Sequence, residues 1–135
     1  MRILFSLLLL QLMLFGTNTY SQNVAKIDSL EKVISQSHSE KQIDALNELA
    51  LVYARVNYQK AKEYFTASLN KSIELSYCHG WAKALQVEAL AVFFNNDHKG
   101  YIELCEQSAQ KAIECQDWKL ACQNYEAIAY VYVTL

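Results

Sequence analysis

A short helical motif recurs along this chain with a period of about 40 residues. Each copy places a large residue, a small residue and another large residue on one face of a helix, since positions three and four apart share a face. The copies are Leu46-x-x-Leu49-Ala50-x-x-Tyr53, Leu85-x-x-Glu88-Ala89-x-x-Val92 and Tyr125-x-x-Ile128-Ala129-x-x-Tyr132. The small central residue lets a second helix approach closely. The period therefore predicts a stack of helix hairpins, one in each repeat.

Long uninterrupted helices are expected, because the chain has no proline and Gly80 and Gly100 are the only glycines after Ser21. An apolar stripe predicts an opening helix within residues 22–40, formed by Val24, Ile27, Leu30 and Ile34. The other predicted helices cover residues 41–56, 58–76, 81–94, 99–115 and 118 to at least 133.

The joints between these helices are short and polar, so consecutive helices are expected to lie antiparallel. Ser39 with Gln42 has the spacing of a capping box. The other expected joint residues are Asn57 as a cap, Gly80 as a break, residues 95–97 as a polar turn and Asp117 as a cap.

This organisation resembles the tetratricopeptide (TPR) family, whose second helix carries a small residue, an aromatic one and another small one. Ala61, Phe65 and Ser68 match that pattern, and the next repeat keeps the spacing with small residues only, Cys105, Ala109 and Ala112. Alanine replaces the family's glycine, the closing proline is missing, and the period is nearer 40 than 34. Other α-solenoids with periods of about 40 therefore stay open as alternatives.

The resemblance implies an all-α solenoid of antiparallel helix hairpins. Residues 22–40 would form a capping helix, and residues 41–135 would form two hairpins and the first helix of a third. The second helix of that third hairpin is expected downstream of Leu135. Until it is covered, the apolar C-terminal end is expected to favour self-association.

The segment 1–21 has the organisation of a signal peptide. Arg2 gives a positive start, residues 3–15 are almost wholly apolar, and residues 16–21 are small and polar. The apolar run is shorter than the roughly 20 residues that span a bilayer, so a permanent membrane anchor is the weaker alternative. Cleavage is expected before Gln22, and the mature protein is expected in the periplasm or cell envelope.

Charge argues against nucleic-acid binding. The 12 basic and 14 acidic side chains nearly balance, and the lysines are scattered among acids rather than clustered. The expected partner is a protein or peptide, with membrane contact only through a further helix downstream of this segment.

Cysteine and histidine spacing provides no metal or catalytic motif. No two of Cys78, Cys105, Cys115 and Cys122 form a C-x-x-C pair, so no metal site is predicted. A disulfide between Cys115 and Cys122 is one alternative. The favoured alternative is that Cys105 and Cys122 are small apolar residues that fill tight contacts between helices.

His38, His79 and His98 lie at predicted joints, far apart in the sequence, and are expected at the surface. The sequence lacks G-x-S-x-G, H-E-x-x-H and glycine-rich phosphate loops. Neither catalytic residues nor a cofactor are predicted for this segment, which is expected not to be an enzyme.

In TPR proteins the first helices of the hairpins form a concave groove that holds peptides. Carried onto this sequence, the groove positions are Asp44, Asn47, Leu51, Arg55, Lys83, Gln86, Leu90, Phe93, Phe94, Gln123, Glu126 and Tyr130. Amides can pair with a peptide backbone while aromatic rings contact its side chains. For Phe93, Phe94 and Tyr130, packing against a following helix is an equal alternative.

The leader and the hairpins together are similar to the N-terminal periplasmic TPR regions of bacterial sensor proteins. Those regions commonly continue into a membrane helix and a histidine-kinase or helix-turn-helix DNA-binding domain. The sequence therefore predicts the protein-binding region of a longer signalling protein. A stand-alone periplasmic scaffold or assembly factor is the alternative, and an enzyme with its catalytic domain beyond this segment is a third.

Overall fold

A computed structural model describes residues 24–134. The expected signal peptide at residues 1–21 and Leu135 lie outside the described residues. The described part is all-helical, as predicted. A helix over residues 24–36 precedes α2 (Glu40–Ala54), α3 (Tyr58–Glu74), α4 (Cys78–Phe94), α5 (His98–Glu114) and α6 (Trp118–Thr134).

The helices follow one another with a constant rhythm. From α3 to α6 each helix has 17 residues and is separated from the next by a three-residue joint. Because helix and joint keep the same lengths, each hairpin follows the last at a fixed interval, as the spacing of the alanines indicates.

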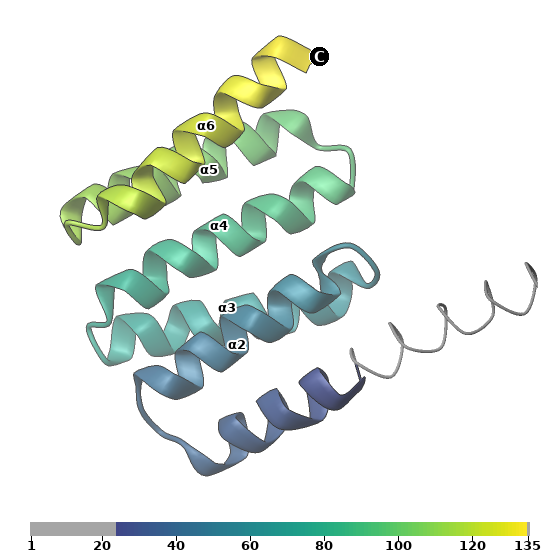
Figure 1. The fold of residues 1–135 in the computed structure, drawn as a ribbon, viewed down its shortest axis with the longest axis vertical. Helices are drawn as coiled ribbons and strands as arrows, with labels where there is room; N and C mark the ends of the chain where they lie inside the picture. The colour runs from purple at the N-terminus through teal and green to yellow at the C-terminus, as the bar shows by residue number, and fades with distance from the viewer. Residues whose placement is uncertain (1–23, 135) are drawn as a thin grey trace, which may run out of the picture.

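Two layers of helices make up the fold (Figure 1). Helices α2, α4 and α6 lie side by side in the front layer, and α3 and α5 lie behind them. Within the stack, α2 packs against α3 and α4, while α4 also packs against α5 and α6. The helix over 24–36 lies beside α2, joined to it by a Lys26–Glu48 ion pair of 3.0 Å. The first helix of every hairpin thus contributes to one common face, called the front face below.

Small residues lie where the helices cross. Ala50 of α2 and Ala89 of α4 are completely buried, as the repeat predicts. Phe65 of α3 and Val87 of α4 fill the space beside Ala50. Ala129, the third member of the series, is exposed on α6, because no helix in the described residues covers that side of α6.

Gly80 does not break the chain between helices, which corrects that prediction. It is the third residue of α4, which begins at Cys78 rather than at Trp81. A Cβ at this position would lie 2.6 Å from Ile43 Cγ2 and 2.8 Å from Ser72 Oγ. The glycine therefore allows α2, α3 and α4 to pack closely.

The helix caps agree with the sequence at two of three sites. Asn57 accepts a hydrogen bond from the Lys60 N–H at 3.1 Å, and Asp117 accepts one from the Leu120 N–H at 3.0 Å. The predicted capping box is wrong. Ser39 makes no side-chain cap, and Gln42 is buried and donates to the Ile34 carbonyl at 2.8 Å. Gln42 bonds the helix over 24–36 and is therefore not available for the capping box with Ser39.

Three joints have a residue in the left-handed backbone region: Ser76, Asn96 and Gln116, with φ of 53°, 62° and 59°. They hold the same position in their joints, one after each of α3, α4 and α5. This conformation ends a helix, and glycine adopts it without the steric cost that a Cβ imposes. Ser76 also explains why α3 stops at Glu74, two residues before its predicted end.

Replacing Ser76 or Gln116 by glycine is expected to stabilise the fold by about 0.5–1 kcal/mol, because relief of the left-handed conformation exceeds the entropy gained by the unfolded chain. Asn96→Gly should gain less, since asparagine tolerates this conformation. Urea unfolding of the three single variants measures the effect. A loss of stability in both Ser76→Gly and Gln116→Gly would contradict it.

Candidate functional site

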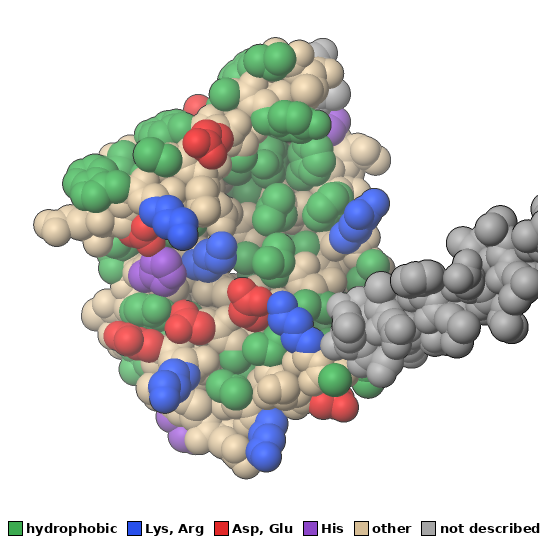
Figure 2. Space-filling view, viewed as in Figure 1, with side chains coloured by type: hydrophobic (Ala, Val, Ile, Leu, Met, Phe, Trp, Pro, Cys, Tyr) green, Lys and Arg blue, Asp and Glu red, His purple; other side chains and the backbone are tan. Residues whose placement is uncertain are grey.

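Every predicted groove residue lies on α2, α4 or α6, the helices of the front face, except Arg55, which directly follows α2. Their side chains differ in exposure. They also differ in polarity between the two ends of the helices. The amino-terminal halves of the helices carry polar groups, and the carboxyl-terminal halves carry apolar ones. Figure 2 shows this face, with hydrophobic side chains gathered over α6 and the adjoining part of α4.

At the apolar end, each of the three helices contributes one predicted groove residue that is hydrophobic and exposed. These are Leu51 of α2, Phe94 of α4 and Tyr130 of α6. The guanidinium of Arg55 lies 5.8 Å from the centre of the Phe94 ring, a cation–π distance. Half-buried Leu90 lies on the same helix as Phe94. Solvent-exposed aromatic and aliphatic groups beside an arginine suit the apolar side chains of a ligand.

Two predicted groove residues serve the packing of the fold instead. Asn47 is buried, and its Nδ2 donates to the Gly80 carbonyl at 3.2 Å, which links α2 to α4. Phe93 is half-buried, with its ring centre 5.3 Å from that of His98 and 4.9 Å from that of Tyr101. The sequence left open whether Phe93, Phe94 and Tyr130 line the groove or pack against another helix. Phe93 packs against the core, whereas Phe94 and Tyr130 are exposed.

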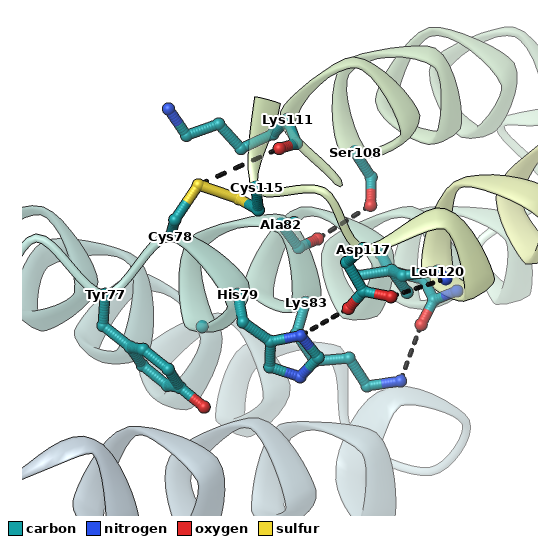
Figure 3. A network of polar contacts seen from close by, with 12 residues as sticks. Tyr77, Cys78, His79, Ala82, Lys83, Ser108, Lys111, Cys115, Asp117 and Leu120 are labelled. Carbon is teal, nitrogen blue, oxygen red and sulfur yellow. Dashed lines mark hydrogen bonds and ion pairs between the residues drawn. A yellow bond between two sulfur atoms is a disulfide. The ribbon is translucent and has the colours of Figure 1, made fainter. Parts of the chain in front are cut away.

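The polar end is held by two side-chain contacts between elements, whose residues Tyr77, His79 and Asp117 are seen in Figure 3. The Tyr77 hydroxyl donates to the Asp44 carboxylate at 3.2 Å, and His79 Nδ1 lies 2.6 Å from Asp117 Oδ2. Burial, and then the negative charge of Asp44, raises the pKa of Tyr77 to about 12. Tyr77 therefore stays protonated and remains a donor at neutral pH.

Asp117 has three tasks at once: it caps α6, contacts His79 and lines the polar end. The Leu120 N–H and then His79 hold the pKa of the Asp117 carboxyl below its usual value. Both carboxylates at this end, Asp44 and Asp117, are thus already engaged within the protein.

A hollow of about 230 Å³ lies between α4 and α6 at the polar end. It is lined by His79, Lys83, Asp117, Lys119, Leu120 and Gln123. Lys83 donates to the neutral amide oxygen of Gln86 at 2.7 Å rather than to a carboxylate. Because two lysines, Lys83 and Lys119, line the hollow against the single carboxylate of Asp117, the hollow presents net positive charge. An acidic group of a ligand suits it best.

Of the residues that line this hollow, the sequence predicted Lys83 and Gln123 as groove positions and missed His79, Asp117, Lys119 and Leu120. The omission of His79 follows from the predicted start of α4 at Trp81, which placed His79 in a joint. The remaining groove residues, Asp44, Gln86 and Glu126, are exposed or half-exposed on the front layer.

A disulfide joins Cys78 to Cys115, with their Cα atoms 5.6 Å apart (Figure 3). Antiparallel packing brings the first residue of α4 to the residue that ends α5. The Cys115–Cys122 alternative is therefore wrong. Cys105 is a buried filler as predicted, whereas Cys122 is exposed on α6. Burial raises the pKa of the Cys105 thiol to about 11, so this thiol is unreactive.

Two further hollows, of about 240 and 380 Å³, share Trp81 and Lys111 as lining residues. Lys111 Nζ lies 4.0 Å from the centre of the Trp81 ring, so the lysine covers the indole. Among residues 24–134, no group of three or more His, Cys, Asp or Glu side chains is placed to hold a metal ion. None of the described helices has the length and hydropathy of a membrane span.

Comparison with models of protein families, with curated proteins and with solved structures finds no match to this chain. Inference about its function rests on the repeat, the front face and the disulfide.

Proposed function

We propose that this segment is an exported, TPR-like module of the cell envelope that binds a peptide segment of a partner protein across the front face. The observation that carries the proposal is the division of that face. Exposed apolar side chains from three helices lie at one end, and at the other end two lysines outnumber the single carboxylate that lines the same hollow.

The TPR-like assignment is supported by the regular hairpins and by the residues at their contacts. Ala61, Phe65 and Ser68, which match the family's second-helix pattern, are all buried against the front layer. The alanines at the crossings take the place of the family's glycine. An α-solenoid built this way forms an extended surface from equivalent helices.

Export is supported by the Cys78–Cys115 disulfide, because such bonds persist in oxidising compartments such as the bacterial periplasm. Together with the leader-like segment 1–21, it favours the cell envelope. We further propose that the module is the sensory or interaction region of a signalling protein with a histidine-kinase or helix-turn-helix output. A stand-alone envelope scaffold is the alternative.

The proposed ligand is an extended peptide that crosses the three front helices. Its apolar side chains contact Leu51, Phe94 and Tyr130, and an acidic group enters the hollow beside Lys83. The side-chain amides of Gln86 and Gln123 provide donors and acceptors for its backbone. No step of chemistry is involved, so affinity is the activity to measure.

Selection of a random peptide library on residues 22–135 tests the proposal. For selected peptides, Phe94→Ala is expected to raise the Kd by about tenfold, the effect of losing an exposed aromatic anchor worth about 1.4 kcal/mol. The matched control is Leu75→Ala, in the α3–α4 joint, where the exposed fraction is 45 % against 43 % for Phe94. Equal effects of the two variants, or failure to select any peptide, would overturn the proposal.

A further inference from the structure

His79 lies at the polar end with one ring nitrogen bonded inside the protein and the other open to solvent. Its Nδ1 lies 2.6 Å from Asp117 Oδ2, as Figure 3 shows. Within residues 24–134, Nε2 makes no hydrogen bond. The side chain is 47 % exposed and lines the hollow between α4 and α6. Nε2 is therefore the polar atom of His79 that is available to a ligand in that hollow.

The contact with Asp117 decides where the imidazole ring gains and loses a proton. The Leu120 N–H and then His79 hold the pKa of the Asp117 carboxyl below its usual value. Asp117 is therefore ionised at neutral and mildly acidic pH, and an ionised carboxylate only accepts hydrogen bonds. Nδ1 must carry a hydrogen in both charge states of the ring. The proton gained on acidification thus binds Nε2, which changes from an acceptor into a charged donor.

Acidification changes the charge of the hollow mainly through this imidazole. The charged groups around His79 are Lys83 on its own helix, Asp117 and Lys119 at the start of α6, and Asp44 and Glu40 of α2, which lie near Tyr77. Carboxyl groups and lysines ordinarily titrate outside the range from about pH 5.5 to pH 8, whereas imidazole titrates within it. The pKa of Tyr77 is about 12, so its hydroxyl stays protonated. Protonation of His79 therefore adds positive charge where the lysines already outnumber the carboxylate.

We propose that His79 makes peptide affinity dependent on pH, because its protonated Nε2 binds the acidic group of the ligand in the hollow beside Lys83. This inference rests on the proposed function and adds regulation to the same site. A neutral ring presents the lone pair of Nε2, which a carboxylate cannot bond. The charged ring donates a charge-assisted hydrogen bond to that carboxylate. Because the bound ligand favours the charged ring, binding strengthens as pH falls and weakens as pH rises.

The test measures the Kd of a peptide selected on residues 22–135 at about pH 5.5 and at about pH 8, on either side of the imidazole range. For a peptide that contains aspartate, the Kd is expected to be about tenfold lower at the acidic pH, through one charge-assisted hydrogen bond. The aspartate itself stays ionised at both pH values. The same peptide with asparagine in its place should change by less than about twofold, because a neutral amide makes no ion pair with the charged ring.

Two substitutions of His79 separate its charge from its contact with Asp117. His79→Gln can still donate to Asp117 but gains no charge, so its Kd should stay at the alkaline value of the unaltered chain at both pH values. His79→Arg is charged throughout, so its Kd should stay near the acidic value. The control is His38→Gln, an exposed residue in the joint before α2. This variant should show the same pH dependence as the unaltered chain.

Equal Kd values at the two pH values in the unaltered chain would overturn this inference. Retention of the pH dependence in His79→Gln, or selected peptides that all lack acidic residues, would overturn it too. Each of these results would leave peptide binding by the front face in place. Failure to select any peptide would overturn the proposed function and this inference together.

Discussion

The double variant Cys78→Ala/Cys115→Ala is expected to have a free energy of unfolding about 2–4 kcal/mol below that of the oxidised chain. The bond closes a segment of 37 residues, and constraint of the unfolded chain by a loop of this size accounts for about 4 kcal/mol in the chain-entropy description. Few single interactions in a stack of two hairpins contribute as much.

Urea unfolding measures this loss, with Cys122→Ala as the control. Cys122 is exposed and unbonded, so removing its thiol should leave the midpoint almost unchanged. Reduction of the unaltered chain should reproduce the loss seen in the double variant. An unfolding midpoint insensitive both to reduction and to the double substitution would contradict the pairing.

The bond also bears on the front face. Cys115 precedes Asp117 by two residues, and Asp117 both caps α6 and contacts His79 of α4. Loss of the disulfide should therefore weaken the positioning of α6 against α4 at the polar end. The affinity of a selected peptide should fall in the reduced chain even at temperatures where the helices persist.

Gly80→Ala is expected to destabilise the fold by about 2 kcal/mol, although alanine favours helix over glycine by about 1 kcal/mol. The added Cβ would lie within 2.8 Å of side-chain atoms of Tyr77, Ile43 and Ser72. Ile43 and Ser72 are completely buried, so neither can move without displacing α2 or α3. Overpacking in such a place exceeds the gain in helix propensity.

Gly100→Ala is the matched control, because this glycine has the same position in α5 that Gly80 has in α4. Its Cβ would meet mainly the carboxylate of Asp97, the exposed cap of α5. Loss of that cap, about 1 kcal/mol, is offset by helix propensity. Thermal unfolding should therefore separate the two variants clearly. A Gly80→Ala chain as stable as the parent would show that the crossing is looser than described.

The periodic features of the sequence were enough to predict the helices and their common core face. Ala50 and Ala89 are buried because their neighbours at three and four residues also pack, so local spacing carries the information. The start of α4 was predicted wrongly, because it depends on contacts between helices rather than on local sequence. Gly80 looks like a helix breaker locally, but three helices meet at its position and select glycine for its size.

Contacts between distant segments account for the other differences. Cys78 and Cys115 pair only because two antiparallel helices of equal length align their ends, which cysteine spacing alone does not reveal. Gln42 similarly bonds a carbonyl of the preceding helix instead of completing a capping box. In the candidate site, the positions of the residues along the repeat were enough to predict which helices form the front layer. They could not show that Asn47 and Phe93 are turned into the packing, because burial depends on neighbouring helices.

Peptide binding at the front face is best tested by a chemical-shift titration of isotopically labelled residues 22–135 with a selected peptide. The largest shifts are expected on α2, α4 and α6, including those of the side-chain amides of Gln86 and Gln123. Shifts confined to α3 and α5, or to the hollows beside Trp81, would contradict it.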